Sequence, residues 1–226
     1  MAPSCLSAMP ITVRRLGTTP YLETLERMRD FTRERAADRG AVGAIGAIGD
    51  ELWLTEHPPV FTMGFASRRE HLLATGDIPV VETERGGQVT YHGPGQVLAY
   101  LLLDLRRRKL GVRELVCRLE AGVIACLAGY GVAAVRKPGA PGIYVARGES
   151  VAKIASIGLK ISRGFTWHGL ALNGRMDLEP FSRIDPCGYP GLLVTDLARE
   201  ASTDLPIEPQ ALARRLAAAL VDAIGG

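Results

Sequence analysis

The sequence predicts an α+β fold, in which helices flank a mixed β-sheet, and three observations support it. Short segments with the alternating or uniformly apolar pattern of strands recur along the chain. Three longer segments carry apolar residues at helical spacing. Two long strand-like segments are separated only by Arg163-Gly164, as in a β-hairpin. With 226 residues, we expect a single domain over 1–226, with residues 1–10 as a ragged N-terminus.

The N-terminal part is predicted to contain a strand followed by a helix. Residues 11–16 have a strand-like pattern, and Thr19 and Pro20 then give a helix start, as N-cap and first helical residue. We expect this helix to end before Gly40. Residues 41–49 are rich in Gly, Ala and Ile without a period, and we interpret them as a mobile or irregular connection, or as a continuation of an edge strand.

Several short strands are expected before the central helix. They cover residues 51–56, 60–63, 80–84 and 97–105, with a helical turn near residues 68–73. Residues 106–109 are four consecutive basic residues, which favours a solvated turn; a docking patch for an acidic protein is the alternative.

The C-terminal half is predicted to contain a hairpin and two amphipathic helices. Residues 112–129 form the first helix, and strands follow at 132–136, 143–146, 153–162 and 165–173. Thr195 is expected to cap a short helix that carries Asp196, Leu197 and Glu200. Pro209 opens the last helix.

Composition and charge narrow the classes of function. The net charge is only +3, which argues against nucleic-acid binding. No segment has the roughly 18 consecutive apolar residues of a membrane span, and residues 1–10 lack the pattern of a secretion signal, so we expect a cytoplasmic protein. No two of the four cysteines have CxxC spacing, which argues against a zinc site. Cys117 and Cys126 are expected to be core thiols.

The stretch RGGQVTYHGPGQ, residues 85–96, is predicted to form one wall of a binding site. Gln88, Thr90 and His92 alternate with Val89 and Tyr91, as on a short strand with one polar face. Glycines on both sides would let the backbone approach a ligand closely. The stretch lacks the Gly-Lys-Ser/Thr of a phosphate-binding loop.

Cys187 is a candidate nucleophile because it lies in a Pro-Cys-Gly loop rather than in a helical stripe. We expect the N–H of Gly188 to be free as an oxyanion donor. A reactive thiol needs a cationic or basic neighbour, and the chain offers Lys153, His92 and His168. Burial would lower the pKa of Lys153 and make it a proton acceptor. His92 and His168 each stand between an aromatic residue and a glycine, which favours a shared polar site.

The sequence resembles the octanoyltransferase family, the lipoyl(octanoyl) transferases of lipoate biosynthesis, from about residue 16 to about residue 197. Five motifs occur in the family's order and spacing: EHPPV at residues 56–60, RGGQVTYHGPGQ at 85–96, KIASIG at 153–158, HGLALN at 168–173 and PCG at 186–188. The resemblance implies the biotin/lipoate protein ligase fold. It also implies transfer of an octanoyl group from acyl carrier protein to a lysine on lipoyl domains of 2-oxoacid dehydrogenases and the glycine cleavage H protein.

The family resemblance also assigns roles to individual residues. Cys187 would carry the acyl thioester and Lys153 would be its catalytic partner, without metal, nucleotide or other cofactor. His168 and Asn173 would support the site. The acyl pocket would be lined by Arg85, Gly86, Gly87, Gln88, Val89, Thr90, Tyr91, His92, Ser156, Ile157, Gly158, Gly169, Leu170 and Ala171.

Two other functions are compatible with parts of this pattern. An ATP-dependent lipoate or biotin protein ligase would use a comparable lysine but would not need Cys187. A non-catalytic acyl-binding module would need the pocket but not the thiol. The Pro/Gly setting of Cys187 favours the transferase.

Overall fold

The computed structural model describes residues 10–40 and 48–225 and contains two β-sheets. The larger sheet has seven strands in the order β1-β2-β6-β10-β9-β8-β7, and the smaller has three in the order β4-β3-β5. The large-sheet strands are β1 (Ile11–Thr18), β2 (Asp50–Glu56), β6 (Gln96–Leu102), β7 (Ala134–Arg136), β8 (Gly142–Arg147), β9 (Ser150–Ser162) and β10 (Phe165–Asn173). The small-sheet strands are β3 (Val60–Met63), β4 (Val80–Glu82) and β5 (Thr90–His92).

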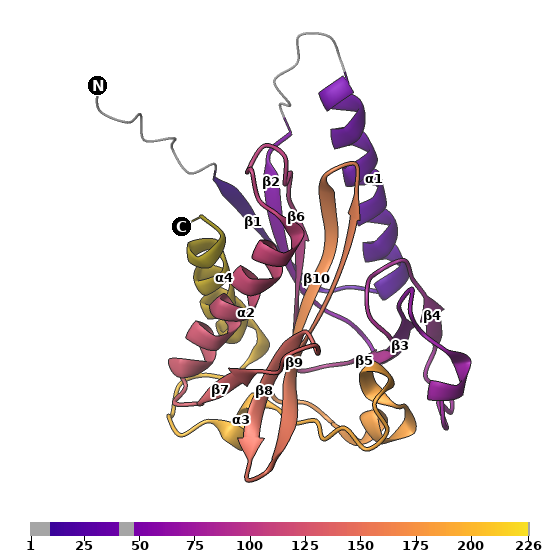
Figure 1. The fold of residues 1–226 in the computed structure, drawn as a ribbon, viewed down its shortest axis with the longest axis vertical. Coiled ribbons are helices and arrows are strands. Elements are labelled where there is room, and N and C mark those ends of the chain that lie inside the picture. The colour runs from indigo at the N-terminus through magenta and orange to yellow at the C-terminus, as the bar shows by residue number, and fades with distance from the viewer. Residues whose placement is uncertain (1–9, 41–47, 226) are drawn as a thin grey trace.

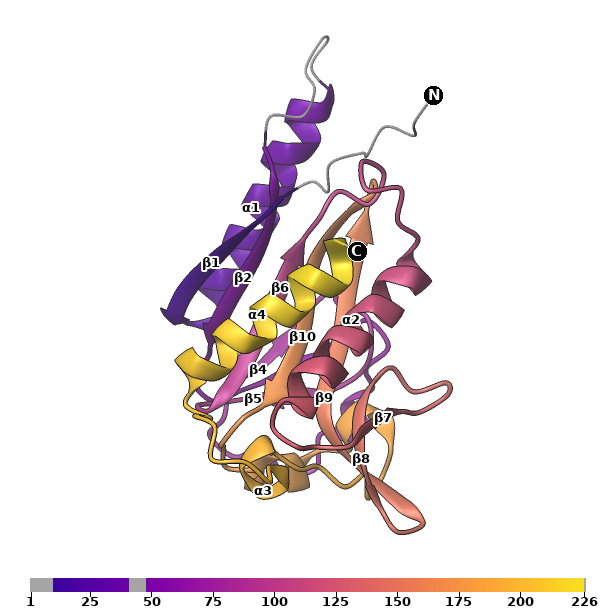
Figure 2. The ribbon, with the colours of Figure 1, turned by 90° about the vertical axis from the view of Figure 1, so that its left-hand side faces the viewer.

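Helices cover both faces of the large sheet (Figures 1 and 2). α2 (Val112–Ala128) and α4 (Pro209–Gly225) lie side by side on one face, and α1 (Tyr21–Gly40) lies on the other. Because side chains alternate along a strand, Leu52 and Leu54 of β2 pack toward α2 and α4, whereas Trp53 packs toward α1. The predicted mixed sheet with flanking helices is confirmed.

The large sheet is mixed because one edge strand is parallel. β1 runs parallel to β2, and every other neighbouring pair in this sheet is antiparallel. The predicted hairpin is confirmed: β9 and β10 pair from Ser162 and Phe165 inward, around a turn in which Arg163 and Gly164 both have positive φ. No described helix is both long and apolar enough to cross a membrane.

The structure corrects two local predictions. The short helix α3 (Leu197–Glu200) is capped by Asp196, whose side chain accepts from the N–H of Arg199, and not by Thr195. Cys126 is buried as expected, but Cys117 is exposed. Cys117 stands two residues from Leu115, so it lies on the side of α2 opposite the buried stripe. Of the segment expected to be irregular, residues 41–47 lie outside the described part of the chain, as do residues 1–9.

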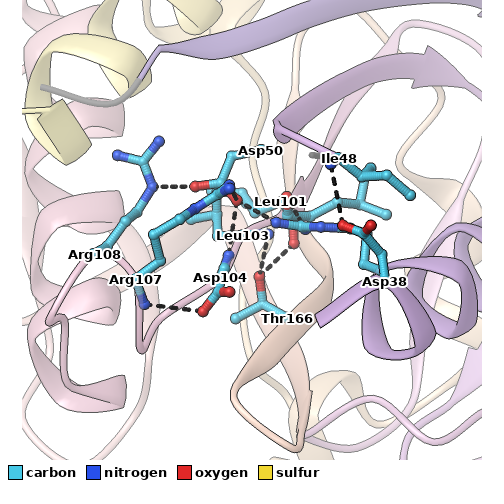
Figure 3. A network of polar contacts seen from close by, with 11 residues as sticks. Asp38, Ile48, Asp50, Leu101, Leu103, Asp104, Arg107, Arg108 and Thr166 are labelled. Atoms are coloured by element: carbon cyan, nitrogen blue, oxygen red, sulfur yellow. Dashed lines mark hydrogen bonds and ion pairs between the residues drawn. The ribbon is translucent and has the colours of Figure 1, made fainter. Parts of the chain in front are cut away.

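The basic run at residues 106–109 is a turn held by a buried carboxylate (Figure 3). Asp50 accepts from Arg107 at 2.9 Å and from Arg108 at 2.5 Å, and it also pairs with Arg35 of α1. The backbone N–H of Asp104 donates to Asp50 as well, at 2.9 Å. Two of the four basic residues are therefore part of the structure, at the end of the sheet where β2 begins and β6 ends. This favours the turn over the docking patch.

Candidate active site

A cavity of about 410 Å³ lies over β9 and β10 and brings together the motifs that the sequence singles out. This size falls within the roughly 300–1,000 Å³ of typical small-molecule sites. Its lining includes Arg85, Gly86, Gly87, Gln88, Thr90, His92, Lys153, Ser156, Ile157, Gly158, His168, Gly169, Leu170, Ala171 and Cys187. Segments far apart in the sequence thus converge on one space.

Cys187 lies at the cavity in a tight turn, the 3-10 segment Pro186–Gly188. Its φ of 58° is left-handed, a conformation that is uncommon for a residue with a side chain. The backbone N–H of Cys187 donates to the carbonyl of Val89 at 3.1 Å, which ties the turn to the residue preceding β5. The thiol is therefore presented from a backbone anchored to the central glycine-rich stretch.

Lys153 meets this thiol from β9. Its Nζ lies 2.9 Å from Cys187 Sγ and donates to the carbonyl of Pro141 at 3.2 Å. The residue is only 5% exposed, and its ammonium lies 5.3 Å from the ring centre of Tyr144. The backbone of Lys153 bonds to Leu193 and Thr195, which follow the cysteine turn in the sequence. Both members of the pair are therefore fixed by main-chain contacts.

The balance of charges around Lys153 differs from the sequence-based expectation. Burial lowers the pKa of Lys153, but the negative charge of the Cys187 thiolate and its hydrogen bond to Nζ, together with Tyr144, raise it. The net pKa lies above the ordinary 10.5. Burial lowers this pKa as predicted, but the net direction is the opposite because the prediction left out the pairing with the sulfur.

The N–H of Gly188 is not the free oxyanion donor that we expected. It donates to the carbonyl of Asp185 at 2.9 Å, because Pro186–Gly188 closes a hydrogen-bonded turn. The side-chain amide of Gln88 lies against Gly188 instead: a Cβ on Gly188 would come within 2.2 Å of Gln88 Oε1. Lys153 thus contacts the sulfur of Cys187, and Gln88 lies beside the turn that carries it.

Arg85 organises the glycine-rich wall of the cavity. Its guanidinium donates to the carbonyl and hydroxyl of Thr62 at 2.7 and 2.9 Å and to the carbonyl of Gln88 at 2.7 Å. The N–H of Gly86 donates to the carbonyl of Leu159 at 2.8 Å, which joins this wall to β9. A Cβ at Gly158 would lie 2.8 Å from the carbonyl of Gly86, so the close approach requires glycine.

Side chains of residues 89–92, which include β5, alternate between the cavity and an apolar cluster, as the sequence pattern predicts. Thr90 and His92 face the cavity, whereas Val89 and Tyr91 pack into a separate apolar cluster with Phe61 and Met63. The expectation that Val89 and Tyr91 line the pocket does not hold for their side chains, because neighbouring residues of a strand point to opposite faces. Val89 contributes instead through the carbonyl that holds Cys187.

Asn173 lies at the end of β10 and supports the site from outside the cavity. Its amide donates to the carbonyl of Thr195 at 2.9 Å and accepts from Gln96 at 2.8 Å. Thr195 bonds in turn to the backbone of Lys153. Asn173 therefore connects the glycine-rich stretch with the segment that pairs with the lysine.

One end of the cavity is bordered by a group of polar aromatic rings, Tyr21, His57, His92, Tyr100 and His168, which we call the ring cluster. The rings of His57 and His92 lie 5.1 and 5.8 Å from that of Tyr21, and Tyr100 lies 6.3 Å from His168. His57 contacts the hydroxyl of Tyr100 at 2.6 Å, and His92 contacts Gln96 at 2.7 Å. Both histidines of the expected shared polar site belong to this cluster.

Sequence reasoning missed three residues at the site, of which Gly142 and Tyr144 lie against Lys153. A Cβ on Gly142 would lie 2.6 Å from Lys153 Cε, so only glycine leaves room for this side chain. Tyr144 lies against the ammonium, and Tyr21 belongs to the ring cluster. Gly142 stands in a Pro-Gly pair, which was the available signal.

Comparison of this sequence with known proteins finds one matching family and relatives that are named octanoyltransferases. Residues 21–221 match the Lipoyl protein ligase A/B catalytic domain. An octanoyltransferase from Pseudomonas entomophila is 56% identical over 209 residues, which cover 92% of this chain and 90% of that protein.

Solved structures share the fold at low sequence identity. The lipoate protein ligase of an archaeal lipoylation system from Thermoplasma acidophilum superposes with a TM-score of 0.65 at 14% identity, covering 94% of this chain and 84% of that one. The biotin protein ligase from Aquifex aeolicus gives a TM-score of 0.51 at 10% identity, covering 95% and 69%. The expected biotin/lipoate protein ligase fold is confirmed.

Proposed function

Because the chain belongs to the octanoyltransferases of the lipoyl protein ligase A/B catalytic-domain family, we propose that it transfers an octanoyl group in protein lipoylation. The proposed donor is octanoyl-acyl carrier protein, and the proposed acceptor is a specific lysine of a lipoyl domain, as found in 2-oxoacid dehydrogenases and the glycine cleavage H protein. The observation that carries this proposal is the contact of 2.9 Å between Lys153 Nζ and Cys187 Sγ at a cavity of suitable size.

In the first step, the Cys187 thiolate attacks the carbonyl carbon of the donor thioester. The new carbon–sulfur bond replaces the bond to the carrier, and the carrier leaves as a thiolate. Lys153 supplies the proton that the leaving thiolate needs. Acylation removes the negative charge that raises the pKa of Lys153, while the lysine stays buried. The buried ammonium therefore becomes a better acid when the leaving group needs a proton.

In the second step, the lysine amine of the lipoyl domain attacks the Cys187 thioester. An amide bond forms, the carbon–sulfur bond breaks, and Cys187 regains its thiolate. Lys153, now neutral, accepts the proton that the attacking amine loses. The restored thiolate again stabilises the ammonium, so the pair returns to its starting state.

The cavity supplies room for the acyl chain and holds its carbonyl end. Ser156, Gly158, Gly169 and Ala171 are small residues of β9 and β10 that line the cavity, and Leu170 adds an apolar contact. Gln88 lies beside the turn that carries Cys187, and its side-chain amide is proposed to bind the thioester carbonyl. These residues are proposed to bind the octanoyl group, with Arg85 fixing the wall that contains them.

A nucleotide-free transfer assay tests the proposed function. Purified protein is mixed with octanoyl-acyl carrier protein and an unmodified lipoyl domain, and the mass of the lipoyl domain is followed with and without ATP. Octanoylation without nucleotide is expected. An absolute requirement for ATP would identify a ligase instead, and chain binding without transfer would identify a binding module.

A further inference from the structure

The end of the cavity that the ring cluster borders, which we call the inner end, contains buried polar groups that the proposed reaction does not use. No described residue is within hydrogen-bonding reach of either ring nitrogen of His168, although this side chain is only 1% exposed. The hydroxyl of Tyr21, 5% exposed, lies beside that of Thr83; burial raises the pKa of Tyr21, and the interaction with Thr83 lowers it. His168 and Tyr21 both line the cavity. Buried polar groups are nearly always hydrogen-bonded, so the imidazole of His168 indicates a polar occupant, with the Tyr21 hydroxyl beside it.

The backbone directs His168 into this position. Its φ of 59° is left-handed and interrupts the alternation of β10. As a result, Trp167 and His168 both pack on the α1 face, where Trp167 joins the apolar cluster of α1 and His168 meets Tyr100. A regular strand would turn His168 toward the opposite face. The fold thus holds a polar ring at the cavity in an uncommon conformation.

The imidazoles of His168 and His92 make the inner end polar without adding charge. Burial lowers the pKa of His168 and of His92 to about 3, and the positive charge of Arg85 adds to the effect. A neutral imidazole offers one donor and one acceptor. The hydrogen bonds of Arg85 go to Thr62, Gly86 and Gln88. A neutral group that can both donate and accept, such as a hydroxyl, therefore matches His168 and Tyr21 better than an anion does.

The spacing along β9 between the level of the Lys153 ammonium and the level of His168 is similar to the length of an eight-carbon chain. The side chain of Lys153 passes Gly142, because a Cβ there would lie 3.2 Å from Nζ, and Gly142 pairs with Ser156. His168 pairs with Leu159, three residues further along β9, which corresponds to about 10 Å. An extended octanoyl chain with bonds of about 1.5 Å spans roughly 9 Å. Its last carbon would therefore arrive at His168.

We propose that the inner end is a polar subsite for an oxygen-bearing chain end, so that the protein also transfers medium-chain acyl groups with a terminal hydroxyl. The hydroxyl of an 8-hydroxyoctanoyl chain would bond to His168 and Tyr21, and ordered water would fill the same place beside an unsubstituted octanoyl chain. The bonds made and broken at Cys187 are those of the octanoyl reaction. This inference rests on the proposed function for its chemistry, but the subsite can be measured without it.

The experiment compares two donors and two variants. Octanoyl- and 8-hydroxyoctanoyl-acyl carrier protein are offered separately, and kcat/KM is determined for each. Tyr21→Phe removes one hydroxyl. His168→Asn replaces the imidazole by a shorter amide, and asparagine tolerates positive φ. Tyr130→Phe is the matched control, because it removes a buried hydroxyl that bonds to Pro206 outside the cavity lining.

An apolar pocket end disfavours an added hydroxyl by about 100-fold, whereas the proposed subsite is expected to accept both donors within about tenfold of each other. Tyr21→Phe and His168→Asn are each expected to shift the ratio of kcat/KM about tenfold toward octanoyl, and Tyr130→Phe is not. A 100-fold preference for octanoyl in the unmodified protein, or a ratio that neither variant changes, would overturn the subsite and place the chain end between Val116 and Ile161.

The free acids separate the two proposals. Calorimetric titration with octanoic acid and 8-hydroxyoctanoic acid measures the subsite without any transfer. If octanoyl transfer fails but 8-hydroxyoctanoic acid binds and Tyr21→Phe weakens it selectively, the proposed function is wrong and the subsite stands. If octanoyl transfer succeeds but the hydroxy acid binds 100-fold more weakly than octanoic acid, the subsite is wrong and the function stands.

Discussion

The ammonium of Lys153 and the sulfur of Cys187 lie 2.9 Å apart although 34 residues separate them in the sequence. The lysine is held in β9, and the cysteine is held in a turn whose N–H bonds to Val89. Burial and the thiolate act on the pKa of Lys153 in opposite directions, and the thiolate, with Tyr144, outweighs burial. A cycle of acylation and release would therefore switch this lysine between acid and base.

Replacing Lys153 by methionine is expected to slow alkylation of Cys187 by iodoacetamide at pH 7 at least tenfold. The ammonium stabilises the reactive thiolate, and methionine keeps the chain length without the charge. Rates are followed by peptide mass spectrometry across pH 6–9. Lys160→Met, on the same strand, is the control and is expected to alkylate Cys187 at the rate of the unmodified protein. Equal rates for Lys153→Met would show that Lys153 is structural.

Replacing Gly142 by alanine is expected to lower octanoyl transfer about 100-fold, because the new Cβ would overlap Lys153 Cε and displace the ammonium. Gly148→Ala is the matched control. It lies in the same β8–β9 hairpin, also has positive φ, and has no atom within 4 Å of its Cβ position. Equal losses in the two variants would assign the effect to backbone strain rather than to the position of Lys153.

The ring cluster is expected to make the fold sensitive to acid. The pKa values of His57, His92 and His168 are lowered from 6.5 to about 4, 3 and 3, chiefly by burial. Below pH 6.5 the unfolded chain binds protons that the folded chain does not, so stability falls as pH decreases toward these values. Each histidine contributes up to about 1.4 kcal/mol per pH unit.

Urea unfolding at pH 7, 6 and 5 measures this effect. The free energy of unfolding is expected to fall steadily over this range, and His168→Asn is expected to reduce the slope. An unfolding free energy that does not change between pH 7 and 5 would show that these imidazoles are not buried in the neutral form.

Replacing Asp50 by asparagine is expected to destabilise the fold by about 3–5 kcal/mol, because it leaves the buried guanidinium of Arg35 without its ion pair. The network lies near Phe165, eight residues of β10 from Asn173 and so about 26 Å from the catalytic end. Thermal unfolding measures the loss, and transfer per folded molecule is expected to stay unchanged. Asp30→Asn, which removes an exposed pair, is the control and is expected to change stability by under 1 kcal/mol.

Much of the fold could be predicted from local patterns. The helices α2 and α4 and the β9–β10 hairpin follow from apolar periodicity and a two-residue turn, which depend on nearby residues only. The division of the strands into two sheets could not be predicted, because register and sheet order depend on contacts between distant segments. The cap at Asp196 was missed because Thr195 beside it is an equally good capping residue.

The sequence predicted most of the residues that meet at the cavity but not the balance of interactions among them. Cys187 and Lys153 could be named from their settings, but the net pKa of Lys153 depends on the distance to the sulfur. The bond from Gly188 to Asp185 depends on how the turn closes, which the Pro-Cys-Gly sequence leaves open. Gly142 was passed over because its importance comes from the path of a distant lysine side chain.

Trapping the acyl-enzyme tests whether Cys187 carries the octanoyl group during transfer. The protein is mixed with octanoyl-acyl carrier protein without a lipoyl domain, quenched in acid, and digested for mass spectrometry. We predict an octanoyl thioester on Cys187, its disappearance when a lipoyl domain is added before the quench, and loss of both adduct and transfer in Cys187→Ser. An adduct on the exposed Cys117, or full transfer by Cys187→Ser, would contradict it.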